Sequence, residues 1–331
     1  MSRILLLATG DTIAQSRDTV PPFVATAEQL LAAISAPTPG SAGALPPGIQ
    51  VIPVDVMAEP SWDTSPTTML ALARRARGAI LDDGFDGVVI THGVDTIEET
   101  AWLVDLLAGP AARRGAIVLT GAVHCLDGPA SDGPANLAAA ITAAADPAMR
   151  GAGAVVCTDG ELHAARWATL RDATAAAGFS SAPHPVLGRV TAAGVELLTT
   201  PPPRPPDPPG EPEADVALIK TYPGMEAVLL TAALDAGARG VVLEGTGLGN
   251  IPVGLFAAIS DLIEWDFPVV IASRSRTGGG SLDDLPLGTG LAGKLGAIGA
   301  RGLSGPKARC ALMVALGAGG VVGARAWFDQ L

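Results

Sequence analysis

Two short polar stretches, each directly behind an apolar run, contain the residues best suited to chemistry. They are residues 9–12 (TGDT) and residues 91–95 (THGVD). A threonine hydroxyl close to backbone N–H groups is the minimum equipment for acyl transfer, because it supplies a nucleophile and an oxyanion hole. We therefore expect Thr12 to be a candidate nucleophile. The simpler alternatives are that Thr12 bonds only its own turn and that Asp95 only caps a helix.

Buried strands are expected to position both stretches. Ile4–Ala8 and Gly87–Ile90 are short apolar runs, which are typical of strands covered on both faces. A helix is expected after the second stretch, because apolar residues recur at helical spacing over 97–107. Asp95 and Glu98 have the spacing of a capping box at its start. Ligands of open α/β sheets bind at such strand ends, so the pattern predicts a site there.

Composition excludes several classes of function. The chain has 331 residues, a hydrophobic content of 48% and a net charge of −12, which predicts two globular domains and argues against nucleic-acid or anionic-membrane partners. Its three cysteines show neither a disulfide pattern nor metal-ligand spacing, and we expect no cofactor. The first apolar run is too short for a signal peptide, and no later run is long enough to span a bilayer. These features predict a soluble cytoplasmic protein.

The remaining pattern predicts an α/β fold with mostly parallel sheets, because strands and helices alternate along the chain. Residues 200–215 contain eight prolines and are expected to form an extended linker. We therefore predict an N-terminal domain over 1–199 that carries the polar turns, and a C-terminal α/β domain over 216–331.

Short motifs along almost the whole chain resemble those of the bacterial L-asparaginase family. Residues 9–14 (TGDTIA) stand where the family has TGGTIA, and residues 91–101 (THGVDTIEETA) stand where it has THGTDTMEETA. Further matches follow in order, at residues 121–124 (GAVH), 131–137 (SDGPANL), 245–250 (GTGLGN) and 306–309 (PKAR). Together, in order along the chain, these motifs predict the fold of that family.

The resemblance implies an amidohydrolase that attacks a small amide with Thr12 and uses Asp95 in proton transfer and in holding an amino group. The residues expected to line the substrate pocket are Gly10, Asp11, Ser61, Trp62, Gly93, Val94 and Ala122. It also implies a homodimer or homotetramer in which a neighbouring copy closes each site. Ser61 has an alternative interpretation as an ordinary turn residue.

Four departures from the family pattern affect the expected catalytic groups and the lid. Val94 replaces the second threonine of the proton relay, Leu170 replaces its lysine, and Asp11 replaces the second glycine of the first motif. The lid tyrosine is missing, since the chain has no tyrosine before Tyr222. Loss of a relay hydroxyl together with its base should lower the rate strongly, so we expect weak or absent turnover of asparagine.

Three functions remain open at this point. The first is hydrolysis of a small amide, either asparagine or a related, less polar amide, with Asp11 or Asp95 as the base and His92 as a further candidate. The second is a catalytically silent homologue that binds an amino acid. The third is a related biosynthetic enzyme whose reaction does not end in hydrolysis.

Overall fold

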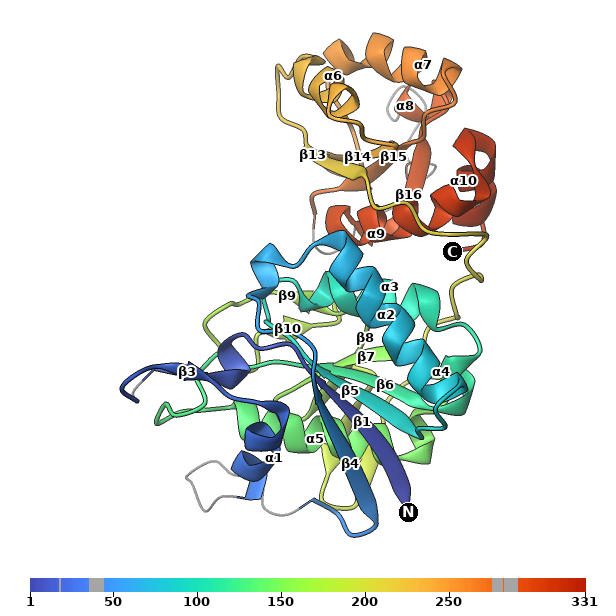
Figure 1. Ribbon diagram of the computed structural model, residues 1–331. Coiled ribbons are helices and arrows are strands. Elements are labelled where there is room, and N and C mark those ends of the chain that lie inside the picture. The colour runs from blue at the N-terminus through green and yellow to red at the C-terminus, as the bar shows by residue number, and fades with distance from the viewer. Residues whose placement is uncertain (18, 36–44, 276–281, 283–290) are drawn as a thin grey trace. The chain divides into compact units, whose positions relative to one another are not determined.

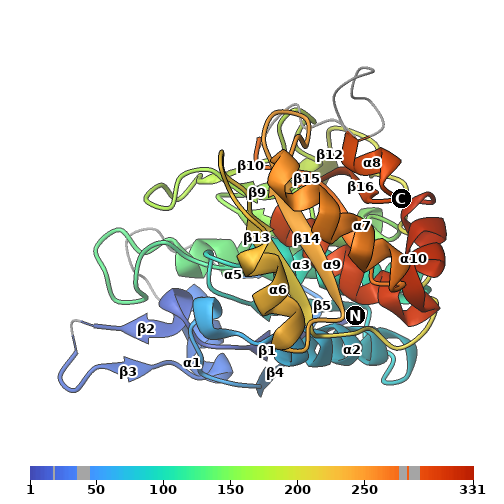
Figure 2. The same cartoon turned by 90° about the horizontal axis from the view of Figure 1, so that it is seen from above.

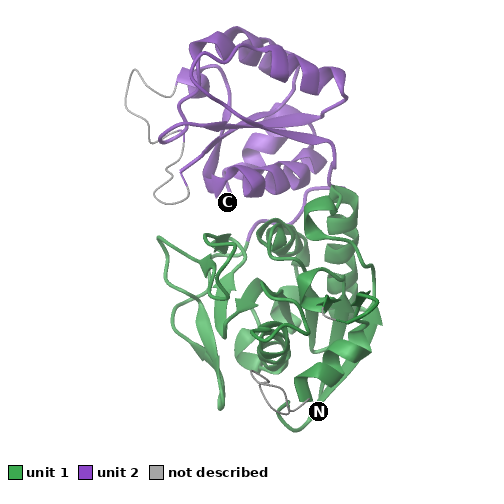
Figure 3. Cartoon of the chain, turned by 90° about the vertical axis from the view of Figure 1, so that its left-hand side faces the viewer, with its two compact units in different colours: residues 1–204 green, residues 205–331 purple. Residues whose placement is uncertain are grey.

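The structure, a computed structural model, describes residues 1–17, 19–35, 45–275, 282 and 291–331. Within these ranges the chain divides into two compact units, Met1–Arg204 and Pro205–Leu331 (Figure 3). Each unit is built on its own central sheet with helices on its faces. The predicted α/β class with mostly parallel sheets is confirmed.

The first unit is organised around one eight-stranded sheet. Its strands in chain order are β1 (Ser2–Ala8), β4 (Ile49–Asp55), β5 (Gly87–Thr91), β6 (Ala116–Thr120), β7 (Ala154–Thr158), β8 (Glu161–Ala164), β11 (Gly188–Thr191) and β12 (Gly194–Leu197). Their order across the sheet is β12-β11-β8-β7-β6-β5-β1-β4. The part from β4 to β7 is parallel, and β8, β11 and β12 continue it antiparallel. β1 therefore lies inside the parallel part, directly beside β5.

Helices cover both faces of this sheet (Figure 1). One face carries α2 (Pro66–Leu81), α3 (Ile97–Ala108) and α4 (Ala111–Arg114), and the other carries α1 (Ala27–Ser35) and α5 (Gly133–Ala145). Side chains of β1 on the second face pack with Leu30 of α1 and Ile141 of α5 in one core. Because both faces are covered, Ile4–Ala8 are all buried, which explains the unbroken apolar run.

The N-termini of two helices test the capping predictions. Thr26 and Gln29 also have the spacing of a capping box in the sequence, and they cap α1, since each main-chain N–H donates to the other residue's side chain, at 2.8 and 3.3 Å. The capping box predicted for Asp95 and Glu98 is wrong. α3 begins at Ile97, so its N-cap is Thr96, and no side chain caps it. The Thr96 hydroxyl instead forms a tertiary hydrogen bond.

Short elements complete the first unit. β2 (Gln15–Ser16) and β3 (Phe23–Val24) form an antiparallel ribbon (Figure 2), and β9 (Thr169–Leu170) pairs with β10 (Phe179–Ser180). The sequence of residues 18–25, with Pro21 and Pro22, predicts a loop, and the ribbon corrects this prediction at Phe23–Val24. Asp18 lies outside the described residues. Three short 3₁₀ helices are η1 (Thr12–Ala14), η2 (Ser61–Asp63) and η3 (Pro147–Met149).

The second unit has a four-stranded parallel sheet in the sequential order β13-β14-β15-β16. These strands are β13 (Val216–Lys220), β14 (Gly240–Gly245), β15 (Val269–Ser273) and β16 (Ile298–Ser304). The helices are α6 (Val228–Asp235), α7 (Phe256–Glu264), α8 (Leu291–Lys294), α9 (Gly305–Ala315) and α10 (Gly320–Phe328), with η4 (Val253–Leu255) and η6 (Leu316–Ala318) beside them. α6 and α7 cover one face of the sheet, and α9 and α10 cover the other (Figure 1). In the described part of the chain, no helix combines the length and apolarity needed to cross a bilayer.

The proline-rich segment contains neither helix nor strand, yet its ends are tied down. Within the second unit, the Glu213 N–H donates to the Met313 carbonyl at 2.8 Å, and the Trp327 indole donates to the Asp207 carbonyl at 3.2 Å. Within the first unit, the Arg204 guanidinium donates a hydrogen bond to the Asp105 carboxylate. The segment is therefore held by side-chain and main-chain contacts of each unit.

Asp105 and Arg204 form the principal ionic contact inside the first unit. Asp105 is a buried residue of α3, and its carboxylate accepts hydrogen bonds from the Arg204 guanidinium and from the Ala154 N–H of β7. Arg204 also donates to the Asp105 carbonyl at 2.9 Å. This contact connects the last residue of the unit to a central helix and a central strand.

We expect Arg204→Met to lower the free energy of unfolding by about 3 kcal/mol, because it removes the hydrogen-bonded charge partner of a buried carboxylate. Thermal denaturation followed by circular dichroism measures the effect. Arg189→Ala is the matched control, since Arg189 forms its ion pair with Glu161 at the surface and should contribute less than about 1 kcal/mol. Equal losses for both variants would contradict the assignment.

Candidate functional site

The two polar stretches lie side by side at one edge of the first sheet. β1 and β5 are neighbouring parallel strands, with Leu7 paired to Ile90. Just beyond them, the Thr9 N–H donates to the Thr91 hydroxyl at 3.2 Å, and the Thr9 hydroxyl donates to the Thr91 carbonyl at 2.6 Å. The two turns therefore follow neighbouring strands, and buried hydrogen bonds hold the turns together.

Asp11 has an unusual backbone conformation in the first turn. Its φ of 67° and ψ of −169° lie in a region that is essentially reserved for glycine. A side chain in such a conformation costs about 1 to 3 kcal/mol, so the surrounding structure must offset the strain. This is the residue that stands where the resembled family has glycine.

The Asp11 carboxylate is almost completely buried, with an exposure of 5%, and it accepts three hydrogen bonds. One oxygen accepts from the Thr12 N–H at 2.6 Å and from the Thr12 hydroxyl at 3.1 Å. The other accepts from the Ser61 N–H at 2.6 Å. Hydrogen bonds to a charged acceptor are stronger than neutral ones, so these contacts offset the backbone strain.

Ser61 joins this site from a distant part of the sequence. It is the first residue of η2 and has an exposure of 3%. Its carbonyl accepts a hydrogen bond from the Thr96 hydroxyl at 2.8 Å, which ties η2 to the start of α3. Among the described residues, its own hydroxyl has no hydrogen-bond partner. Ser61 is thus fixed through its main chain, while its side-chain oxygen stays available.

Glycines let these segments meet. A side-chain carbon at Gly93 would collide with both the Asp11 carboxylate and the Ser61 hydroxyl. At Gly10, which has φ of +84°, such a carbon would lie 2.9 Å from Ala58 Cα. The first turn, η2 and the second turn therefore converge on one point because Gly93 has no side chain.

Two apolar residues of the neighbouring turns are buried. Val94 and Ala122 are both buried, and the chain at Gly121 passes so close to the His92 carbonyl that a side chain there would collide with it. Val94 also lies close to Gly121, since its Cγ1 would be 3.1 Å from an added side-chain carbon. The residue at the relay position is therefore packed against the neighbouring turn.

Other predicted site residues stand apart from this cluster. The Asp95 side chain is exposed and forms no hydrogen bond or ion pair with another described residue. Trp62 is 65% exposed. Leu170 lies in β9, where its N–H donates to the Glu98 carboxylate at 3.2 Å. The structure therefore brings Gly10, Asp11, Thr12, Ser61 and Gly93 together, whereas Asp95 and Trp62 face solvent.

His92 is a structural residue of the second turn. Its Nδ1 donates to the Gly93 carbonyl at 2.9 Å, and its Nε2 accepts from the Thr100 hydroxyl at 2.9 Å. Burial of the ring lowers the pKa of His92, which favours the neutral form. Both ring nitrogens are occupied, so His92 orients the Gly93 carbonyl and has no ring nitrogen left for the Thr12 hydroxyl.

Sequence reasoning missed two residues that position the site. Thr9 joins the two turns, and Thr96 holds the main chain of Ser61. Both residues belong to the motifs of the polar turns, which indicated that they lie near the site. Their residue type alone did not predict their hydrogen-bond partners, which are distant in sequence. Asp11 also carried a signal, because an acidic residue in a glycine position implies a side chain with special contacts.

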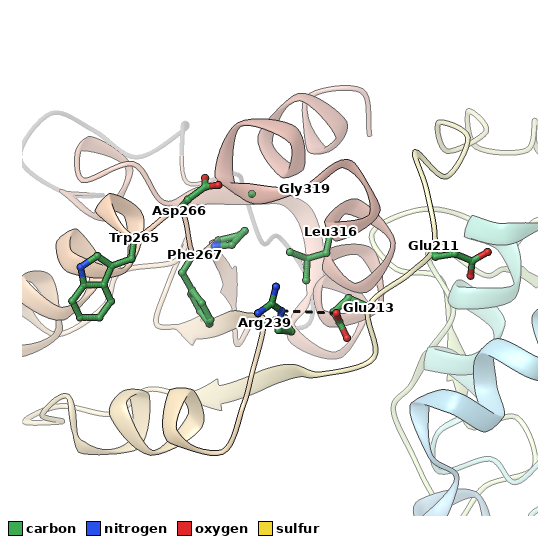
Figure 4. Close-up of a pocket in the computed structure, with 10 residues that line it drawn as sticks. Glu211, Glu213, Arg239, Trp265, Asp266, Phe267, Leu316 and Gly319 are labelled. Carbon is green, nitrogen blue, oxygen red and sulfur yellow. Dashed lines mark ion pairs between the residues drawn. The ribbon is translucent and has the colours of Figure 1, made fainter.

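The second unit contains a separate cavity of about 360 Å³ that includes none of the predicted site residues (Figure 4). Its charged groups serve structural roles. Arg239 pairs with Glu213 at 3.9 Å, and the Asp266 carboxylate accepts from the Val321 N–H at the start of α10 at 2.8 Å.

No set of three His, Cys, Asp or Glu side chains within the described ranges could hold a metal ion. Burial raises the pKa of Cys157 to about 12, so this thiol stays protonated.

Comparison with known proteins gives consistent matches over both units. Residues 3–203 match the family model described as asparaginase, N-terminal, and residues 215–324 match the glutaminase/asparaginase C-terminal domain. A probable L-asparaginase of Deinococcus radiodurans is 36% identical over 294 residues, which cover 85% of this chain and 87% of that protein.

Two solved structures have a similar fold over nearly their whole length. The probable cytoplasmic L-asparaginase of Campylobacter jejuni has a TM-score of 0.81 at 26% identity and covers 100% of both chains. The thermostable L-asparaginase of Thermococcus kodakarensis has a TM-score of 0.84 at 25% identity and covers 99% of this chain and 97% of its own.

His92 should contribute to acid sensitivity. Its pKa is lower in the folded than in the unfolded protein, so the unfolded state binds more protons below pH about 6.5 and gains stability there. We expect this residue to add up to about 1.4 kcal/mol per pH unit to the loss of stability on acidification. Urea denaturation at several pH values between 7 and 5 gives the free energy of unfolding at each pH. This free energy should fall less steeply with decreasing pH for His92→Gln than for the unaltered protein. An unchanged slope would contradict a neutral, buried His92.

Proposed function

The chain belongs to the asparaginase family and is a hydrolase of amide C–N bonds, and we propose that it cleaves a small amide with Thr12 as its nucleophile. The residues that surround Thr12 support this role. Thr12 is partly exposed at the end of a buried strand, whereas Asp11 and Ser61 beside it are buried. Thr12 therefore lies between a buried polar cluster and the exposed side of the turn.

The observation that carries the proposal is the contact between the Thr12 hydroxyl and Asp11. The two oxygens are 3.1 Å apart, which is within the reach that a general base requires of its nucleophile. Asp11 cannot turn away, because the main-chain N–H groups of Thr12 and Ser61 fix its carboxylate at 2.6 Å each. We propose Asp11, which was one of the base candidates, as the group that accepts the Thr12 proton.

The reaction then follows the chemistry of acyl transfer in two steps. Thr12 Oγ forms a bond to the amide carbon as its proton passes to Asp11, and the C–N bond breaks as that proton leaves with the amine as ammonia. Water next attacks the resulting ester, and Asp11 accepts a proton from the water. That proton returns to Thr12 Oγ as the ester bond breaks, which releases the carboxylic acid and restores the enzyme.

The environment of Val94 and Leu170 supports a route that differs from the family relay. Val94 carries no group that can accept a proton, and it is packed against the turn at Gly121. The Leu170 side chain carries no group that can act as a base, and its main-chain N–H donates to the Glu98 carboxylate at 3.2 Å. We propose that Asp11 replaces this relay and that asparagine itself is a poor substrate.

Location and assembly are also proposals. One structural relative is named a probable cytoplasmic L-asparaginase, which supports a cytoplasmic location for this chain. The resemblance to the family implies two or four copies, with a neighbouring copy closing each site.

Thr12→Ala should abolish ammonia release from every amide that the unaltered protein cleaves, because no other group supplies the attacking oxygen. Thr12→Ser should keep part of the activity, and Asp11→Asn should lower kcat by about 10²- to 10⁴-fold, since the amide cannot accept the proton. A coupled ammonia assay over a panel of small amides measures all three. The control Thr231→Ala, which removes an exposed hydroxyl in α6, should not change the rate. Full activity of Thr12→Ala would overturn the proposal.

Light scattering at micromolar concentration tests the assembly. We expect a mass of two or four times 33.1 kDa. A single mass of 33.1 kDa together with full amidase activity would show that no neighbouring copy is needed at the site.

A further inference from the structure

The donors around Asp11 form an anion-binding site that the protein fills with its own side chain. Two main-chain N–H groups from separate segments, those of Thr12 and Ser61, point at the carboxylate, and the Thr12 hydroxyl adds a third donor. Such convergent N–H groups are the usual means by which proteins bind small anions. In this chain the bound anion is covalently attached.

A second, independent observation marks the same point as a ligand site. The Ser61 hydroxyl is buried and has no hydrogen-bond partner among the described residues. It lies next to the Asp11 carboxylate, because a side-chain carbon at Gly93 would collide with both groups. A buried hydroxyl that lacks a partner is costly, and a polar group of a bound substrate would supply one.

A free carboxylate would be disfavoured at this position for two reasons. The three donors already serve Asp11, so a second anion would find none of them available. It would also lie next to a buried negative charge, and no ion pair connects Asp11 to a cation in the described part of the chain. Like charges in contact inside a protein repel each other strongly.

We propose that Asp11 determines the substrate class of this enzyme by occupying the position next to Thr12 that an anion would otherwise take. This inference rests on the proposed role of Thr12. The favoured substrates are primary amides that carry no carboxylate group, and amides of amino acids such as asparagine are disfavoured. An amino group is compatible with the site, since the nearby fixed charge is negative.

The backbone indicates which substitution opens the site. Glycine adopts the conformation of Asp11 without strain, so Asp11→Gly should fold while it removes the carboxylate and frees the donors. Asp159 provides a matched control, because it is also an aspartate with positive φ, at 49°, but lies in the turn between β7 and β8. Asp159→Gly should leave substrate choice unchanged.

Binding can be measured without turnover in the Thr12→Ala background, which keeps both main-chain N–H donors. The two probes are asparagine and β-alaninamide, which is asparagine with its carboxylate replaced by hydrogen. Calorimetry should show that Thr12→Ala binds β-alaninamide at least about tenfold more tightly, and that Thr12→Ala with Asp11→Gly reverses this preference. The control that combines Thr12→Ala with Asp159→Gly should show the same preference for β-alaninamide over asparagine as Thr12→Ala alone.

The outcomes separate this inference from the proposed function. An unchanged preference in the Asp11→Gly form, or no binding of asparagine to it, would overturn the role of Asp11. Absence of ammonia release from every amide by the unaltered protein would overturn the proposed function and leave the binding result valid. Should Asp11→Gly fail to fold, Asp11→Asn removes the charge with little change of shape and should at least narrow the preference, and an unchanged preference there would also overturn the inference.

Discussion

The site depends on the hydrogen bonds that the buried Asp11 carboxylate accepts from Thr12 and Ser61. This carboxylate fixes the first turn to η2 through the Ser61 N–H, and it sets the position of Thr12 through that residue's own N–H. In return, these donors hold Asp11 in a backbone conformation that would be unfavourable without them. The missing side chain of Gly93 leaves space for this arrangement. The conformation of the turn and the charge within it therefore require each other.

The fold could be read from the sequence where local pattern and tertiary environment agree. The apolar runs at Ile4–Ala8 and Gly87–Ile90 form neighbouring parallel strands because helices cover both faces of their sheet. The capping box at Thr26 is formed because its partners are close in sequence. At Asp95 the same pattern failed, since the adjacent Thr96 uses its hydroxyl to hold Ser61, 35 residues away. A capping rule, which considers only residues close in sequence, cannot predict that contact.

The site was only partly predictable for the same physical reason. Residue types identified Thr12 and its glycine-containing turn, and the resemblance pointed to Ser61 and Gly93. The sequence did not indicate that Asp11 would turn inwards and accept donors from both Thr12 and Ser61. That arrangement depends on a main-chain conformation that propensities assign to glycine and on a hydrogen bond that spans 50 residues. Trp62 lies beside Ser61 in the sequence, but its side chain is 65% exposed in the single chain, so its place in the pocket wall stays a prediction.

The glycine-like backbone at Asp11 has an evolutionary consequence. Aspartate and glycine codons can differ by one base, and the main chain here accepts glycine without strain. A lineage with this fold can therefore move between an occupied and an empty anion position in a single mutational step, with little cost to folding. Each state can be reached from the other by one mutation. With the proposed role of Asp11, related genes with opposite substrate preferences can therefore arise repeatedly and independently. Overall sequence identity would then be a poor guide to the substrate, and the residue after the first glycine of this turn would be a better one.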